Sequence, residues 1–494
     1  MNTEKPEINI VWFKRDLRLL DNEAIHNAIK SGVPTLLLFV FENSLRNDKH
    51  YSERHWNFIK QSILDLNKQL EPYTTRVLSV NSEIISVVST LQQFWKINTV
   101  YSHQETGIRL TYDRDKNFSR FCKNNRIHWK QHINNGVFRG ERDRMDWSDK
   151  WEKYMMQPVH DFKPDTNSFI PIATLDNLSN HFNTANLHTA HYPLMQVGGS
   201  TMAHRYLTSF FEERIKNYNA HISKPALARK GCSRLSPYLA WGNLSVRQVW
   251  HYAKVIRKTS TFKKQIDSFT SRLRWQAHFI QKFEMEDTME FESVNKGYHK
   301  LKKQVSDAYI KAWKTGQTGY PLIDACMRCL SETGYLNFRM RALVVSFFTH
   351  NLWQPWQEAT SHLSQMFLDF EPGIHFPQLQ MQAGETGTNL LRIYNPIKNS
   401  LEHDPEGHFI RKWVRELRDL PPEFIHEPFK MTPLDQKFND FVLGVDYPNP
   451  IVELPSTRKY ASDTLWALRD DQLVKEENLR ILKKHTLPNR RAFD

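Results

Sequence analysis

Residues 8–41 read INIVWFKRDLRLLDNEAIHNAIKSGVPTLLLFVF, and this stretch decides the fold of the first third of the chain. Its two ends, 8–13 and 35–41, are continuous apolar runs typical of buried strands, and the amphipathic residues 22–30 between them predict a helix. Working outward, we predict a helix at 55–70, a strand at 76–80, a helix at 84–94 and a strand at 99–102. Strands and helices that alternate in this way predict a parallel sheet covered by helices.

The pattern changes twice further along the chain. From about residue 137 to 200 the period is lost and charged residues, Asn and Pro dominate, so we predict a long surface connector ordered in part by its tryptophans. Beyond residue 201 the strand patterns end, and we predict helices at 203–218, 245–257, 268–283, 321–332 and 339–353. The expected domains are an α/β domain at 1–135, a linker at 136–200 and a helical domain at 201–494.

Composition narrows the class of protein. Among 494 residues, 67 Lys and Arg stand against 54 Asp and Glu, and the net charge of +13 favours a polyanionic partner such as nucleic acid or an acidic membrane surface. No apolar stretch approaches the roughly 18 residues that a membrane-spanning helix needs. The polar first residues do not resemble a signal peptide, and the 4 cysteines are too few to staple this chain. We therefore expect a cytoplasmic protein.

Residues 232–247, CSRLSPYLAWGNLSVR, carry the first candidate ligand site. Ser233 and Ser236 flank Arg234, and the next residue, Pro237, is favoured at the first position of a helix. Hydroxyl groups and unpaired backbone N–H groups at a helix start bind anions. An ordinary capped helix explains the same residues, so both interpretations stay open at this point.

Residues 318–330, TGYPLIDACMRCL, combine a turn with a helix start. Asp324 and Arg328 are one helical turn apart and can form an ion pair. Cys326 and Cys329 form a single CxxC, whereas a zinc site needs a second pair of ligands at suitable spacing. We interpret both thiols as helix-packing side chains and expect no bound metal.

Two arginines enter a nearly apolar helix within residues 334–356, GYLNFRMRALVVSFFTHNLWQPW. Arg339 and Arg341 need carboxylates or phosphates as partners, because a buried guanidinium without one is costly. We place the carboxylates in the next segment, at Asp369 and Glu371. An internal salt bridge would still leave one arginine without an explanation.

Five blocks of sequence together resemble the photolyase/cryptochrome family of blue-light flavoproteins. The blocks are VWFKRDLRLLDN (11–22), SRLSPYLAWGNLS (233–245), TGYPLIDACMR (318–328), RIYNPIKNS (392–400) and DPEGHFIRKW (404–413). They occur in the family's order over nearly the whole chain. The resemblance implies a Rossmann-like α/β antenna domain with a parallel sheet, a long linker, and a large all-α domain that binds FAD in a U shape.

The resemblance also assigns roles to individual residues of the cofactor site. It implies that the FAD pyrophosphate is clamped by Tyr218, Ser233, Arg234, Leu235 and Ser236. It places the Arg341–Asp369 pair beside the isoalloxazine ring, where a cation favours the anionic reduced form, and it places Glu371 facing the flavin or its ribose.

A second set of residues falls where the family binds DNA. Cations around the mouth of the lesion pocket would contact phosphates flanking a flipped dinucleotide, and they are Arg339 (also assigned to the cofactor), Arg392 and Lys398. Trp275 matches the indole on which a flipped pyrimidine pair stacks, and we interpret it as a substrate contact instead of a core residue.

The chain departs from the family pattern at two catalytic positions. Arg272 stands where most photolyases carry a Glu that hydrogen-bonds the pyrimidine carbonyl; an arginine donates a hydrogen bond but does not readily give up a proton. His375 falls at or next to the family's Asn opposite flavin N5, where we expect it to donate a hydrogen bond or a proton.

The chain of three tryptophans that reduces FAD in the family is broken. The middle position matches Trp356, but the inner one falls on Leu379 or Gln380 and the outer one near Lys303. These side chains cannot be oxidised as an indole is, so standard photoreduction is not expected. Other electron routes could use Trp353, Trp313 and several tyrosines.

The antenna domain carries the segment SHQETGIRLTYDR (102–114), which resembles a loop that contacts a second chromophore in some family members. A pterin or deazaflavin could bind at His103, Gln104 and Glu105, although surface hydrogen bonding explains these residues equally. The 4 cysteines lack the four-Cys spacing of the family's iron–sulfur branch.

We therefore expect a monomeric deoxyribodipyrimidine photo-lyase, in which photoexcited reduced FAD transfers an electron to a cyclobutane pyrimidine dimer in DNA. A cryptochrome-type photoreceptor that binds FAD without repair is an alternative, supported by Arg272 and the broken tryptophan chain. A (6-4) photoproduct photolyase is another, because histidine acid chemistry is expected there. A basic helical nucleic-acid-binding protein without a cofactor is disfavoured by the five blocks.

Overall fold

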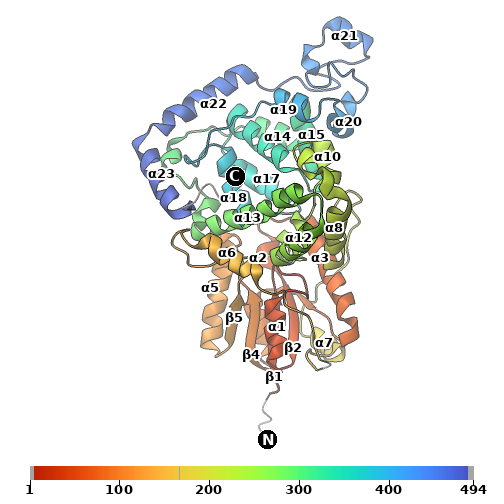
Figure 1. Ribbon diagram of the computed structural model, residues 1–494, viewed down its shortest axis with the longest axis vertical. Helices are drawn as coiled ribbons and strands as arrows, with labels where there is room; N and C mark the ends of the chain where they lie inside the picture. The colour runs from red at the N-terminus through yellow and green to blue at the C-terminus, as the bar shows by residue number, and fades with distance from the viewer. Residues whose placement is uncertain (1–4, 166, 488–494) are drawn as a thin grey trace.

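The computed structural model describes residues 5–165 and 167–487. An α/β domain lies at one end of its long axis and a larger helical domain at the other (Figure 1). The chain passes from the sheet through the linker to the helices, in the order that the sequence predicts.

A five-stranded parallel sheet forms the N-terminal domain, in the order β3–β2–β1–β4–β5. The strands are β1 Glu7–Phe13, β2 Thr35–Glu42, β3 Leu78–Ser82, β4 Lys96–His103 and β5 His128–His132. The four strands predicted from apolar runs are confirmed, and β2 is buried on both faces, which explains its continuous hydrophobicity. The edge strand β5, HWKQH, was not predicted because its polar residues give no apolar pattern.

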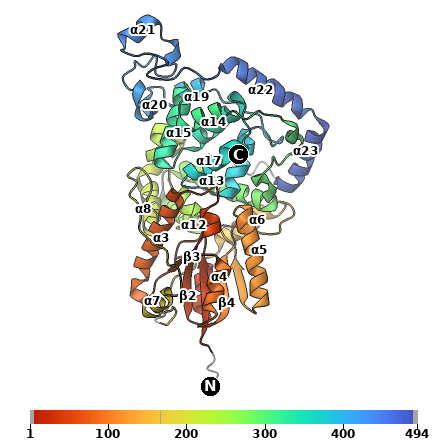
Figure 2. The same cartoon turned by 180° about the vertical axis from the view of Figure 1, so that it is seen from behind.

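Helices cover both faces of this sheet. One face, with Val11 and Leu37, packs against α1 Glu23–Lys30 and α3 Glu53–Leu70. The other face, with Trp12 and Leu38, packs against α4 Ile84–Leu91 and α5 Arg109–Asn124. Figures 1 and 2 show α1 and α4 in front of the sheet from opposite sides, and the short α2 Asn43–Arg46 follows β2. The expected Rossmann-like layers are therefore present.

The linker is more ordered than the sequence analysis predicts. It contains α6 Trp147–Met156 and α7 Ile172–Ser179, where only a surface connector was expected. Trp147 and Trp151 are one helical turn apart and are 1% and 0% exposed, and the ring of Trp151 lies 5.1 Å from that of Trp250. The expected ordering by tryptophans is present at α6, but its helix was not predicted, because charged neighbours obscure the apolar spacing that buries it against the helical domain.

The rest of the described chain, up to residue 487, is helical, and the prediction of an all-α domain is confirmed. Its α-helices are α8 Ser200–Ser209, α9 Tyr218–His221, α10 Pro225–Gly231, α11 Ser236–Ala240, α12 Val246–Thr259, α13 Lys263–Met285, α14 Asp307–Thr315, α15 Pro321–Thr333, α16 Phe338–Ser346, α17 Gln357–Met366, α18 Pro372–Gln382, α19 Pro396–His403, α20 His408–Trp413, α21 Pro433–Phe438, α22 Leu454–Arg469 and α23 Gln472–His485. Within the described ranges, no helix has the length and apolar character needed to cross a bilayer.

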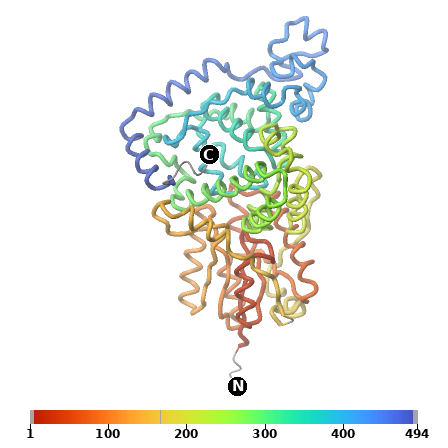
Figure 3. The backbone as a smooth tube through the Cα atoms, viewed as in Figure 1, coloured from red at the N-terminus to blue at the C-terminus, as the bar shows by residue number. Residues whose placement is uncertain are grey.

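Two of the predicted helices are interrupted by π-helical turns. The stretch predicted at 203–218 passes through Phe210–Arg214, and the stretch predicted at 339–353 passes through Phe347–Asn351. Such turns are frequent next to functional sites. The backbone trace in Figure 3 shows α22 and α23 wrapping around the outside of this domain; α22 contacts the second π-turn and α23 contacts the 3₁₀ helix Lys296–Lys300.

The first two sequence blocks meet where the domains join. Gly242 has a φ of +73° and lies so close to the first block that a Cβ would meet the carbonyl oxygen of Arg15 at 2.2 Å. Arg247 pairs with Asp21 at 2.5 Å, and the hydroxyl of Ser245 donates to the same carboxylate. Because this ion pair is buried, losing either partner would strand the other charge, so the pair fixes how the domains dock.

Candidate cofactor and substrate site

In the loop before α11, the carbonyl oxygens of residues 232–234 accept hydrogen bonds, whereas two of the amides are open. Arg214 donates to the carbonyl oxygens of Cys232 at 2.5 Å and Ser233 at 3.4 Å, and Gln196 Nε2 donates to that of Arg234 at 2.8 Å. In the described chain, the amides of Ser233 and Arg234 are assigned no acceptor. The loop therefore presents N–H groups suited to an anion such as a pyrophosphate, and its residues fit FAD.

Arg234 contributes its backbone amide, not its side chain, to the candidate anion site. Its φ of +59° is left-handed, which is rare for a residue other than glycine. The side chain is 7% exposed, and its guanidinium carbon lies 3.9 Å from the centre of the Tyr335 ring. Leu235 is buried and continues into α11, whose first residue is Ser236. The guanidinium is thus engaged by protein, and the amides are what this loop offers to a ligand.

The predicted ion pair between Arg341 and Asp369 is confirmed. Arg341 Nη2 lies 2.7 Å and 3.0 Å from the two carboxylate oxygens, and its Nε donates to the carbonyl of Leu336 at 2.9 Å. The guanidinium carbon stacks 3.9 Å from the centre of the Phe367 ring. The Asp369 side chain is 5% exposed and that of Arg341 is 27% exposed, so the arginine remains accessible to a ligand.

The other predicted cations lie toward the surface. Arg339 is half-buried, and burial together with the nearby Arg339 charge lowers the pKa of His403 at the end of α19. Arg392 and Lys398 are exposed, and Lys398 Nζ lies 3.7 Å from a carboxylate oxygen of Glu402. These three cations, which we call the basic rim, are partly or fully exposed to solvent.

Tyr218 and Arg272 lie side by side. Burial raises the pKa of Tyr218 well above its ordinary range, while the Arg272 guanidinium, which hydrogen-bonds the phenol, acts in the opposite direction. Arg272 itself is exposed on α13. Two residues assigned separately from sequence therefore form one contact.

Trp275 lies three residues further along α13 and is half-buried. Its ring centre is 5.5 Å from that of His278 at 76° and 6.1 Å from that of Phe279. Arg144, which is 0% exposed, donates to the carbonyl and to Nδ1 of His278 at 3.2 Å and 3.1 Å, and stacks 4.0 Å over Trp147. Sequence reasoning missed Arg144 and His278, which support the predicted stacking residue.

His375 is neutral and oriented as an acceptor. Burial lowers the pKa of His375 to about 3, and Nε2 lies 3.0 Å from the carbonyl oxygen of Thr360. Because a carbonyl only accepts, Nε2 carries the proton and Nδ1 is a bare acceptor. Rings of Phe370 and Phe376 pack at 5.2 Å and 5.3 Å. This arrangement opposes the predicted role of His375 as a donor of a hydrogen bond or a proton.

Glu371 faces the antenna domain. Its carboxylate accepts a hydrogen bond from Arg15 Nη1 at 3.2 Å, and the Arg15 guanidinium carbon lies 4.5 Å from the centre of the Trp241 ring. Burial raises the pKa of Glu371 to about 7, although Arg15 acts against the shift. Glu371 therefore titrates near neutral pH at the junction of the two domains.

A polar pocket opens at the same junction. Besides Arg15 and Glu371, it is lined by Gln104, Glu105, Thr106, Asn134, Asn135, Val137, Leu239, Ala240 and Ile280. Three buried atoms at its wall have no hydrogen-bond partner: Arg15 Nη2, Gln104 Oε1 and Asn134 Oδ1. His103 does not line it and instead pairs with Asp16 at 2.7 Å. Unsatisfied buried groups at a pocket wall are suited to a polar ligand.

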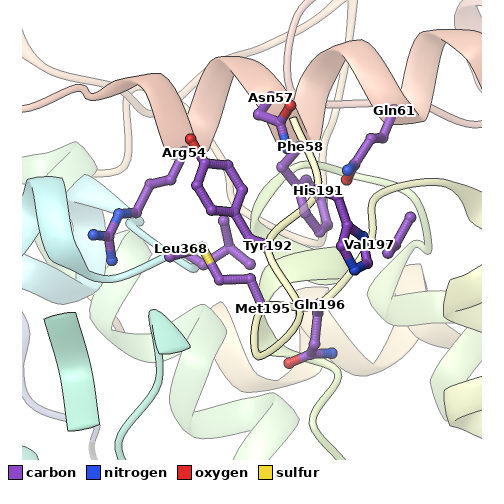
Figure 4. Close-up of a pocket in the computed structure, with 10 residues that line it drawn as sticks. All are labelled: Arg54, Asn57, Phe58, Gln61, His191, Tyr192, Met195, Gln196, Val197 and Leu368. Carbon is purple, nitrogen blue, oxygen red and sulfur yellow. The ribbon is translucent and has the colours of Figure 1, made fainter. Parts of the chain in front are cut away.

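A second pocket lies between α3 and the linker (Figure 4). Its lining comes from α3, from residues 191–197 and from the segment before Asp369: Arg54, Asn57, Phe58, Gln61, His191, Tyr192, Met195, Gln196, Val197 and Leu368. Arg54 donates to the carbonyl of Met366 at 2.7 Å, and Gln196 reaches the loop before α11. The linker thereby braces the loop before α11 through Gln196, and α3 braces the segment before Asp369 through Arg54.

The tryptophan positions are occupied as the sequence predicts. Trp356 is fully buried, and Leu379 is an apolar core residue. The Gln380 amide fastens a loop by donating to the carbonyls of Met289 and Glu292 at 2.8 Å and 2.9 Å. Neither inner candidate supplies an oxidisable ring.

The buried thiols of Cys326 and Cys329 lie within α15. Burial raises the pKa of both thiols, as expected for packing side chains. No group of three or more His, Cys, Asp or Glu is arranged to hold a metal ion within residues 5–165 and 167–487.

Comparison with known proteins agrees with this geometry. Residues 9–146 match the family model for DNA photolyase, and residues 269–467 match the model for the FAD binding domain of DNA photolyase. A deoxyribodipyrimidine photo-lyase of Alkalihalophilus pseudofirmus is 26% identical over 481 residues, which are 92% of this chain and 97% of that protein. Cryptochrome DASH of Synechocystis sp. is 26% identical over 478 residues, which are 90% of this chain and 95% of that protein.

A solved structure shares the fold over nearly the full length. The crystal structure of a Synechocystis sp. cryptochrome has a TM-score of 0.82 and 24% sequence identity, and the match covers 93% of this chain and 99% of that chain. Both domains and their order are therefore shared. The chain belongs to the photolyase/cryptochrome family.

Proposed function

We propose that the protein is a deoxyribodipyrimidine photo-lyase that binds FAD and uses light to split cyclobutane pyrimidine dimers in DNA. The observation that carries the proposal is the loop before α11, whose carbonyl oxygens are occupied while the amides of Ser233 and Arg234 remain open. When bound, FAD supplies light absorption and the electron that splits the dimer.

The chain's own residues have separable tasks in this scheme. The open amides bind the pyrophosphate, and Arg341, oriented by Asp369, supplies positive charge beside a reduced flavin. His375 offers an acceptor to the ring. The hydrophobic surroundings of these groups exclude water, which strengthens each electrostatic contact.

Recognition of the damaged DNA falls to α13 and the basic rim. Trp275 stacks on the flipped bases, a contact worth about 1–3 kcal/mol per base. Arg144 and His278 hold the Trp275 ring from the linker side. Arg339, Arg392 and Lys398 contact the flanking phosphates, in keeping with the net charge of +13.

A light-dependent repair assay tests the proposal. The chemically reduced holoprotein is mixed with an oligonucleotide that contains one cyclobutane dimer, and restored thymines are counted after blue light and after darkness. We expect restoration only in the light. Dimers that persist after prolonged illumination of the flavin-loaded, reduced protein would reject repair.

A cryptochrome-type photoreceptor is the second candidate. Arg272 is engaged by Tyr218 where most photolyases have a Glu, and the inner tryptophan position holds Leu379 or Gln380. A receptor would bind FAD and respond to light while leaving the dimer intact in the same assay. The (6-4) alternative is disfavoured because His375 is neutral and its one proton is directed at Thr360.

We also propose that the pocket between the domains holds a second chromophore, a pterin or a deazaflavin. Flat heterocycles with amide groups match the unpartnered Arg15 donor and the Gln104 and Asn134 acceptors. After reconstitution with each chromophore and gel filtration, the protein that retains it should show an absorption band in addition to the flavin bands. Retention of neither chromophore would reject this assignment and leave the flavin proposal untouched.

A further inference from the structure

A buried hydrogen-bonded path leads from Trp356 to a carboxylate. The indole Nε1–H of Trp356 donates to Ser293 Oγ at 3.0 Å, and the Ser293 hydroxyl donates to Glu385 Oε2 at 2.6 Å. The three residues are 0%, 4% and 5% exposed. The second distance is typical of an O–H donor bound to an ionised carboxylate.

Lys303 supplies the counter-charge to Glu385. Its ammonium lies 3.0 Å from Glu385 Oε1 and also donates to the carbonyl of Thr349 at 3.3 Å. Both side chains of the ion pair are nearly buried, at 3% and 7% exposure. The pair is balanced in charge, and the carboxylate oxygen on the Ser293 side remains able to take up a proton.

Other buried indoles of the helical domain are partnered differently. Trp313 donates its Nε1–H to the carbonyl of Val344 at 3.1 Å, and Trp241 donates to the carbonyl of Leu368 at 2.8 Å. A peptide carbonyl accepts a hydrogen bond but does not accept a proton near neutral pH. The path from Trp356 differs because it ends on a base.

We propose that Ser293 and Glu385 form a proton-accepting relay for Trp356 when this indole loses one electron. The inference rests on the proposed function, because the oxidant is a photoexcited oxidised flavin bound in the same domain. Since Leu379 and Gln380 supply no inner ring, the electron passes from Trp356 to that flavin in one longer step. Electron loss makes the indole N–H strongly acidic. The Trp356 N–H bond breaks, Ser293 takes that proton and passes its own to Glu385, and the electron goes to the flavin, which leaves a neutral indole radical and a carboxylic acid.

Lys303 also opposes transfer of the radical toward the surface. Its ammonium lies 4.8 Å from the centre of the Trp353 ring, and a cation over an aromatic face stabilises the electron-rich, unoxidised ring. Trp353 in turn packs 5.1 Å from Tyr460, which is 58% exposed. Oxidation of Trp353 is therefore electrostatically disfavoured, and proton loss retains the radical on Trp356.

Transient absorption on the FAD-loaded full chain tests the relay. After a short blue pulse on the oxidised protein, the protonated and the neutral indole radicals are distinguished by their visible bands. We expect the wild type to form the neutral radical, and to form it more slowly in D₂O. Glu385→Gln preserves the shape but removes the base, so deprotonation should slow by about 100-fold. Ser293→Ala should act in the same direction.

Three variants keep the test decisive. Trp356→Phe should abolish the radical bands, whereas Trp313→Phe should leave their kinetics unchanged. Because Glu385→Gln strands the Lys303 ammonium, the double variant with Lys303→Gln restores charge balance and should still deprotonate slowly. Equal deprotonation rates in wild type and both Glu385 variants, with no effect of D₂O, would overturn the relay while repair stands. A flavin-loaded wild type that forms no indole radical would overturn the relay, and a protein that takes up no flavin would overturn both proposals.

Discussion

The Arg114 cluster of the α/β domain and the loop before α11 differ in how their buried polar groups are partnered. Arg114 is bound by three carboxylates, those of Glu42 at 2.7 Å, Glu105 at 2.6 Å and Asp115 at 2.8 Å. In the loop, the amides of Ser233 and Arg234 meet no protein acceptor in the described chain. Folded proteins pair most of their buried polar groups, so a cluster whose charges pair with one another is structural, whereas a loop with unpaired amides is prepared for a ligand.

The largest expected effect on stability comes from breaking the ion pairs of Arg114. Arg114→Met leaves three buried carboxylates without their shared cation, and we expect the free energy of unfolding in urea to fall by about 3–5 kcal/mol. The folded fraction should still bind flavin, because the loop before α11 is untouched. The matched control is Arg76→Met, which removes an exposed pair with Asp176 and should cost less than about 1 kcal/mol. Equal losses of unfolding free energy in Arg114→Met and Arg76→Met would contradict the expected difference between a buried and an exposed cation.

A pH-dependent effect of nearly the same size is expected at Glu371. Its pKa of about 7 in the fold lies above the ordinary 4.5, so the folded protein binds more protons between these values and its stability falls as the pH rises through them. The loss reaches up to about 3 kcal/mol once the pH exceeds the folded pKa. Glu371→Gln removes it, so the variant should gain stability relative to wild type between about pH 5 and pH 8. If the unfolding free energies of wild type and Glu371→Gln change in parallel with pH, burial does not raise the pKa of Glu371 as argued.

A smaller, specific effect is expected for the substrate contact. Trp275→Ala should weaken binding to dimer-containing DNA by about 1–3 kcal/mol per stacked base, with flavin retained and undamaged DNA bound as before. Gel-shift titrations with damaged and intact duplexes measure both. The control is Trp466→Ala, which removes a 48% exposed indole on α22. Unchanged affinity for damaged DNA in Trp275→Ala would exclude the stacking role.

The smallest effect is expected on the basic rim. Lys398→Gln removes one exposed cation, and it should weaken damaged and undamaged DNA alike and reduce the slope of log affinity against log salt by about 1. Fluorescence anisotropy over a salt series provides the slope. A loss confined to damaged DNA would instead place Lys398 at the lesion.

How much the sequence predicts depends on the range of the interaction. Apolar runs and helical spacing predict four of the five strands and eight of the 23 α-helices of the described chain, because those signals are local. The Arg341–Asp369 pair was predicted because the family resemblance implies it, whereas the apolar surroundings alone left open which arginine meets which carboxylate. The edge strand β5 lacks a local apolar pattern, and the apolar spacing of α6 is obscured by its charged neighbours, so both were missed.

The supporting residues of the site escape sequence reasoning for the same reason. Gln196 reaches the carbonyl of Arg234 across 38 residues, and Arg144 reaches His278 across 134. Nothing near Glu385 in the sequence indicates that its oxygens meet Ser293 and Lys303. The orientation of His375 is likewise set by the distant Thr360 carbonyl, which turns an expected donor into an acceptor.

Flavin uptake tests the central claim most directly. The purified chain is incubated with FAD, passed through gel filtration, and scanned for absorbance before and after reduction, with Arg341→Ala in parallel. The account predicts a yellow wild-type protein that carries about one FAD per chain and bleaches on reduction, and weaker retention in the variant. A correctly folded wild-type protein that remains colourless after incubation would contradict it.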